Sequence, residues 1–105
     1  MITRLWRGWT TIENADAYER FLLGEVFPSM REISDFRGAD VLRRSEHDEV
    51  AFITLTRFDS LSAIKAFAGE DHETPVLEPQ ALALLARYEQ RALHFDTATF
   101  TTETP

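Results

Sequence analysis

Cysteine is absent from this sequence of 105 residues. Disulfide frameworks, thiolate nucleophiles and cysteine-ligated metals are therefore excluded. Glycine is scarce, with four residues, and these form neither a phosphate-cradling loop nor a nucleophile elbow around a serine. Nucleotide binding and serine hydrolysis therefore have no support in the sequence.

Basic side chains are also few, with 11 against 18 acidic side chains and a formal net charge of -7. Such a surface repels phosphate backbones and anionic lipids, so we expect no nucleic-acid partner. Long apolar runs are missing too, since the longest run of alanine and leucine, residues 81–86, has six residues. A membrane span needs about 20, and the N-terminus lacks the pattern of a signal peptide. We expect no membrane association and a cytoplasmic location.

The first third of the chain predicts a strand and a helix. Residues 2–11 alternate polar and apolar side chains, which is typical of a strand. Thr10 and Glu13 have the spacing of a capping box, and the apolar residues after them recur at helical intervals. Pro28 interrupts this pattern, so we expect a kink or a restart near Phe27. The apolar helix positions are Tyr18, Phe21, Leu22, Val26, Met30 and Ile33.

The middle of the chain predicts a hairpin and a second helix. Residues 36–45 and 50–58 are extended runs separated by a polar segment of turn length. Asp59 or Ser60 can cap the helix that follows, and Gly69 can end it.

The last third predicts a helix and a strand. Pro79 is suited to the first turn of a helix that runs through Leu82, Leu85 and Tyr88. Residues 92–100 are rich in threonine and aromatic side chains and predict a final strand. The polar end that follows, residues 101–105, is expected to fray.

The order strand, helix, strand, strand, helix, strand predicts an α+β fold of the ferredoxin-like βαββαβ type, an antiparallel sheet with helices on one face. We expect a single domain over residues 1–105, because the length and the 44% hydrophobic content suit one globular unit.

The other face of the sheet is expected to be covered as well. In the strand over residues 50–58, both parities carry large apolar side chains, whereas a strand with one wet face should alternate cleanly. We therefore predict a homodimer with facing sheets, in which Trp6, Ile53 and Leu55 lie in the interface.

Several short motifs resemble the antibiotic biosynthesis monooxygenase superfamily. They are Tyr18-Glu19-Arg20-Phe21, Asp35-Phe36-Arg37-Gly38, Phe58-Asp59-Ser60 and Phe67-Ala68-Gly69. The resemblance covers roughly residues 2–97 and implies a dimeric α+β barrel with a pocket in each protomer. It also implies one of three roles, because the family includes cofactor-free monooxygenases, heme-degrading enzymes and members without established activity.

The resemblance argues against heme degradation. In the heme-degrading branch an asparagine, a tryptophan and a histidine carry function, and ungapped matching puts these at Leu5, Phe67 and about Leu77. All three are changed, and His72 is too distant to be assumed equivalent. We therefore expect no heme, no metal and no other cofactor.

Side chains on two strands are candidates to line a helix-side pocket. Arg7 and Trp9 share one parity of the first strand, while Thr54, Thr56 and Phe58 share one parity of the third. Aromatic walls with a few polar groups suit a planar aromatic ligand. Packing in the core and at its rim is the alternative. Phe67 and His72 complete the predicted ligand-binding set.

Histidines are the candidates for proton transfer. His94, in the predicted last strand, is the candidate general base for a phenolic substrate, and a hydrogen-bonded structural histidine is the alternative. His47 and His72 each stand among acidic residues, but contiguous residues rarely all reach one ion. Solvated loop charge is therefore favoured over a metal site.

Two functions are consistent with these features. The first is a small cofactor-independent monooxygenase that acts on a planar phenolic or quinone-like compound. The second is a non-catalytic dimeric barrel that binds a small ligand or serves a stress response.

Overall fold

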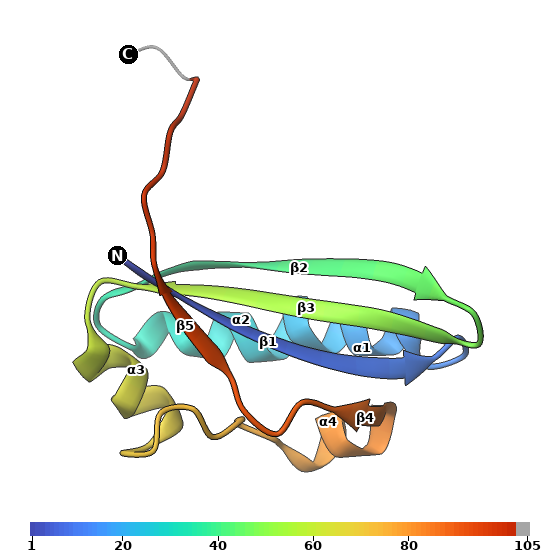
Figure 1. Ribbon diagram of the computed structural model, residues 1–105. Helices are drawn as coiled ribbons and strands as arrows, with labels where there is room; N and C mark the ends of the chain where they lie inside the picture. Colours follow the sequence, from blue (N-terminus) through green and yellow to red (C-terminus); the bar gives the residue numbers. More distant parts are fainter. Residues whose placement is uncertain (103–105) are drawn as a thin grey trace.

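The computed structural model describes residues 1–102 and shows one antiparallel sheet with helices packed on one of its faces (Figure 1). The five strands are β1 (Ile2–Thr11), β2 (Phe36–Glu46), β3 (Glu49–Phe58), β4 (Leu85–Tyr88) and β5 (Leu93–Asp96). Their order is β2-β3-β1, and the far edge of β1 pairs with β5 near its start and with β4 near its end. The predicted α+β, ferredoxin-like class is confirmed.

The first helical segment is broken at the predicted place. α1 (Ala15–Phe21) passes through a π-helical turn, η1 (Leu22–Val26), into the short α2 (Phe27–Ser29) and a 3₁₀ turn, η2 (Met30–Glu32). Pro28 lacks the N–H that an unbroken helix requires there, which explains the change of helical type just before it.

The predicted capping box of Thr10 and Glu13 does not form. β1 continues through Thr11, so Thr10 is buried within the strand. The Thr11 hydroxyl instead accepts a hydrogen bond from the Asn14 backbone N–H at 3.2 Å.

The hairpin and the second helix match the prediction. β2 and β3 pair along their whole length around a turn at His47 and Asp48. The Ser60 hydroxyl caps α3 (Leu61–Ala68) by accepting from the Ala63 N–H at 3.1 Å. Gly69 ends the helix at a φ of 94°, a conformation that favours glycine.

The third helix is shorter than predicted. α4 (Pro79–Leu84) stops before Leu85, and residues 85–88 form β4 on the edge of β1. This pairing is close, because a Cβ at Gly8 would lie 2.9 Å from Cδ2 of Leu85. Pairing with the open edge of β1 therefore outweighs the helical pattern of these residues.

The last strand is also shorter than expected, and the chain leaves the body of the molecule after β5 (Figure 1). Phe100 is 90% exposed on this arm. Of the end that was expected to fray, residues 103–105 lie outside the described part of the chain.

The core lies between the sheet and the helices in two clusters. Tyr18, Phe21 and Phe52 belong to the first, with Tyr18 edge-on to Phe52 at a centroid distance of 5.0 Å. Met30, Phe58 and Ile64 belong to the second. Burial raises the pKa of Tyr18 to about 12, so its phenol stays protonated. Within residues 1–102 no helix is long and apolar enough to cross a membrane.

Candidate functional site

A cavity of about 60 Å³ lies between the sheet and the helical layer. Arg4 and Trp6 of β1 and Thr54 and Thr56 of β3 form its floor. These four belong to one parity of each strand and face each other in register, Arg4 beside Thr56 and Trp6 beside Thr54. Apolar side chains of the helices complete the wall, including Tyr18, Leu22, Met30 and Phe67.

Two hydroxyl groups on this floor are available for a ligand. Among residues 1–102, no side-chain hydrogen bond involves Thr54 or Thr56, and no fully buried side-chain polar atom lacks a partner, so both hydroxyl oxygens remain accessible. Thr56 is nevertheless buried, with 6% of its surface exposed. A hydroxyl that is accessible from a cavity is suited to bind a polar atom of a ligand.

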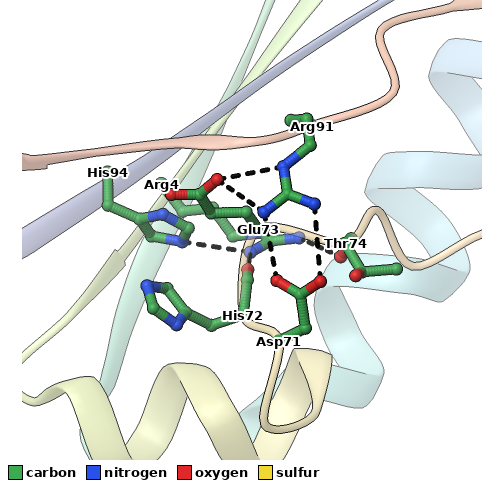
Figure 2. A network of polar contacts seen from close by, with 7 residues as sticks. All are labelled: Arg4, Asp71, His72, Glu73, Thr74, Arg91 and His94. Carbon is green, nitrogen blue, oxygen red and sulfur yellow. Dashed lines mark hydrogen bonds and ion pairs between the residues drawn. The ribbon is translucent and has the colours of Figure 1, made fainter.

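Arg4 is the only buried charged side chain of the described residues, with 4% of its surface exposed. Its Nη1 donates to the backbone carbonyl of His72 and to Nε2 of His94, the latter at 3.0 Å, and its Nη2 donates to the carbonyl of Thr74 at 2.9 Å (Figure 2). The guanidinium also lies 5.6 Å from the centroid of the Phe67 ring. Burial lowers the pKa of Arg4 to about 10, so it remains positively charged at neutral pH.

A segment without helix or strand, residues 70–78, covers one side of the cavity, and we call it the covering segment. Pro75, Val76 and Glu78 of this segment line the cavity. Arg4 holds the backbone carbonyls of the segment, whereas Arg91 binds its carboxylates (Figure 2). Two arginines therefore fix the cover of the cavity.

The carboxylates bound by Arg91 are those of Asp71 and Glu73, at 3.2 and 2.8 Å. The side chains of all three residues are roughly half exposed, so each ion pair contributes little by itself. The backbone N–H of Ala92 adds a hydrogen bond to the Glu73 carbonyl at 2.7 Å. The segment is thereby tied to the start of β5.

His94 is held as a neutral imidazole. Arginine can only donate, so Nε2 of His94 accepts the bond from Arg4 and its proton lies on Nδ1. Burial, followed by the charges of Arg4 and His72, lowers the pKa of His94 below 6.5, while Glu73 acts in the opposite direction. The ring of His72 lies edge-on to it at a centroid distance of 4.9 Å.

The structure brings part of the predicted ligand-binding set together. Thr54, Thr56 and Phe67 line the cavity, and Phe58 is buried in the core with its ring centroid 6.2 Å from that of Phe67. His72 lies beside the cavity, where its carbonyl accepts from Arg4. Their role in binding stays a prediction.

The predicted facing of the first strand is wrong. Arg7 and Trp9 lie opposite Ile53 and Ala51, on the face away from the cavity, and Trp6 lies on the cavity side instead of facing a partner. The indole of Trp9 is covered by the guanidinium groups of Arg87 and Arg7, 3.9 and 5.4 Å from its centroid.

The cause of this error is that β1 carries tryptophan and arginine on both parities, so the alternation alone does not identify the inner face. Sequence reasoning also missed Arg4, because arginine is almost never buried unless paired. The register supplies the missing signal, since Arg4 pairs with Thr56 on one side and with His94 on the other.

Metal ligands do not converge in the described part of the chain. Among residues 1–102, no three His, Asp or Glu side chains are grouped so that they could hold an ion. The acidic residues beside His72 bind Arg91 instead.

No protein-family model matches the chain, and no curated protein matches it. Solved structures do match. A crystal structure of an antibiotic biosynthesis monooxygenase has a TM-score of 0.64 at 15% identity, over 94% of this chain and 100% of that chain.

Two further similar structures contain ligands. The monooxygenase ActVA-Orf6 of Streptomyces coelicolor, in complex with nanaomycin D, has a TM-score of 0.59 at 11% identity, over 98% of this chain and 92% of that chain. The heme degrader MhuD of Mycobacterium tuberculosis, with two hemes in its active site, has a TM-score of 0.60 at 15% identity, over 96% of this chain and 99% of that chain. The chain therefore has the fold of antibiotic biosynthesis monooxygenase structures, and at these identities the likeness shows the fold alone.

Proposed function

We propose that the chain is a member of the antibiotic biosynthesis monooxygenase superfamily and acts as a cofactor-independent monooxygenase on a planar phenolic or quinone-like compound. The observation that carries this proposal is the cavity floor, where the unpartnered hydroxyls of Thr54 and Thr56 lie beside the buried charge of Arg4. The fold supports it, because ActVA-Orf6 holds nanaomycin D and MhuD holds two hemes on the same architecture.

The proposed chemistry needs no added reductant. A threonine hydroxyl binds the phenol oxygen, and the positive charge of Arg4 favours the phenolate by lowering its pKa. The phenolate supplies all the electrons to O₂. One oxygen atom forms the new carbonyl of the quinone and the other leaves as water, so phenol and O₂ balance quinone and water.

His94 is the proposed base, and its lone pair must first be freed. Nε2 already accepts from Arg4, so it takes a proton only when that hydrogen bond opens. Two positive groups would then lie side by side, which disfavours the protonated imidazole. Removal of the proton by His94 therefore depends on movement of Arg4 toward the ligand.

Binding also requires the covering segment to move. Ligand pockets usually enclose roughly 300–1,000 Å³, whereas this cavity has about 60 Å³. The part of the cover nearest the cavity, residues 75–78, has no regular structure and is the part expected to open.

The alternative function, a ligand-binding barrel without catalysis, is favoured by one observation. The imidazole nitrogen of His94 that faces Arg4 already accepts a hydrogen bond from it. If that bond persists with ligand bound, the site binds without removing a proton.

We also propose that the chain forms a homodimer through the sheet face opposite the helices. Leu42, Leu93 and Phe95 are 47%, 54% and 49% exposed on this face, next to the half-buried Ile53 and Leu55. Together they make an apolar surface that a second copy would cover.

Oxygen uptake tests the catalytic proposal. Purified protein is incubated with monocyclic and bicyclic phenols in the presence of a chelator, and uptake is compared with that of the Thr56→Val variant. We expect uptake above the rate of autoxidation, reduced in the variant. Binding without uptake across the panel would instead support the alternative function.

A further inference from the structure

We propose that the compound bound in this cavity is an aromatic carboxylic acid whose carboxylate pairs with Arg4. The inference deepens the proposed function, since it places the ligand in the same cavity. It begins from the unusual position of a guanidinium that is buried and has no countercharge.

All direct polar partners of Arg4 in residues 1–102 are neutral. They are two backbone carbonyls, of His72 and Thr74, and one imidazole nitrogen, of His94. Charged side chains are costly to bury unless an opposite charge compensates them. The lowered pKa of Arg4 follows from burial alone, with no acidic group acting against it.

The nearest carboxylates are committed elsewhere. Asp71 and Glu73 bind Arg91, although they belong to the segment whose carbonyls Arg4 holds. Glu78 is the one acidic residue that lines the cavity, and it is exposed and forms no ion pair with Arg4. The described residues therefore leave the negative charge to be supplied by the ligand.

The donors that Arg4 has left suit a carboxylate. Nη1 uses both of its hydrogens and Nη2 uses one, so Nε–H and one Nη2 hydrogen have no acceptor among the described residues. Nε and Nη2 form one edge of the guanidinium, the edge that binds carboxylates through two parallel hydrogen bonds.

The surroundings select an aromatic acid. The guanidinium lies over the Phe67 ring, and the rest of the wall is apolar or aromatic apart from the threonine hydroxyls and the exposed Glu78. A carboxylate on a planar ring would meet Arg4 with its charged end and these apolar side chains with its ring.

The matched probes benzoate and benzamide test the inference. They share shape and size but differ in charge, and binding to the wild-type protein is followed by calorimetry and by NMR titration. We expect benzoate to bind at least about 10-fold more tightly. Equal binding, preference for benzamide, or no binding of benzoate at millimolar concentration would overturn the inference.

Variants assign the preference to one side chain. Arg4→Gln should abolish the preference for benzoate, and Arg4→Lys should retain part of it. Arg20→Gln removes an exposed charge from α1 and should leave it unchanged. A preference that survives in a folded Arg4→Gln protein contradicts the assignment. If Arg4→Gln does not fold, the assignment is tested in the wild-type protein. Benzoate should then shift the Arg4 Nε–H resonance, and no shift contradicts the assignment.

These measurements need no turnover, so they separate this inference from the proposed function. Benzoate preference without oxygen uptake from any phenol would retain the carboxylate site and reject the oxygenase. Oxygen uptake from phenols with no preference for benzoate would retain the oxygenase and reject the carboxylate site.

Discussion

Arg4 and His94 are directly paired across β1 and β5, and Nη1 of Arg4 lies 3.0 Å from Nε2 of His94. This bond joins the buried cation at the cavity to the candidate base. It holds the imidazole neutral with its proton on Nδ1, and it links the protonation of His94 to the position of Arg4.

The first prediction concerns stability against pH. Because the folded protein lowers the pKa of His94 below 6.5, the unfolded chain binds more protons between that lowered pKa and about 6.5. The free energy of unfolding should therefore rise with pH through this window and fall as acid is added. Urea unfolding of wild type and His94→Gln from pH 5 to pH 8 measures it, with a shallower slope expected in the variant.

A matched histidine serves as the control for that experiment. His47 lies in the exposed turn between β2 and β3, so His47→Gln should keep the wild-type slope. Identical slopes in wild type and His94→Gln would show that His94 is not held neutral by the fold.

The second prediction separates catalysis from structure at His94. A positioned general base typically contributes about 10² to 10⁴-fold to rate. His94→Ala should therefore lower turnover far more than it lowers the melting temperature, with both measured on one preparation. A lower melting temperature with normal turnover per folded molecule would assign His94 to packing.

The third prediction tests the close approach of β4 to β1. A side chain at Gly8 meets Leu85 at 2.9 Å and the backbone carbonyl of Arg87 at 3.6 Å. Gly8→Val should destabilise the protein by about 1–3 kcal/mol, the usual cost of overpacking. Gly24→Ala is the matched control, because nothing lies within 4 Å of its added Cβ. Chemical unfolding that ranks the two variants equally would contradict the strand pairing.

The fourth prediction tests the proposed homodimer. Ile53→Asp places on the uncovered sheet face a charge that a second copy would have to bury, and it should convert the dimer to a monomer. Leu82→Asp changes an equally apolar, 47% exposed residue of α4 and should leave the dimer intact. Sedimentation at micromolar concentration measures both, and a monomeric wild type would reject the dimer.

Local signals made part of this fold predictable. Ser60 and Gly69 determine the two ends of α3 by chemistry that requires no distant contact. Pro28 marks the break in the first helical segment for the same reason. The hairpin follows from two extended runs and a short polar turn.

Other features depend on contacts distant in the sequence. Residues 85–88 have a helical pattern and become a strand because the edge of β1 is open to them. Arg4 is buried because the covering segment and β5 supply its partners, from residues about 70 and 90 positions away. Thr54 and Thr56 were predicted as pocket residues because they share one face of β3 with Phe58.

Isotope labelling shows whether the chain is a cofactor-independent monooxygenase. Protein freed of metal by chelation is allowed to oxidise a phenol under ¹⁸O₂, and the quinone is trapped at once by reduction so that its oxygen does not exchange with water. Cofactor-independent monooxygenation predicts one ¹⁸O atom in each product molecule and no hydrogen peroxide. Product without ¹⁸O, with hydrogen peroxide released in its place, would contradict it.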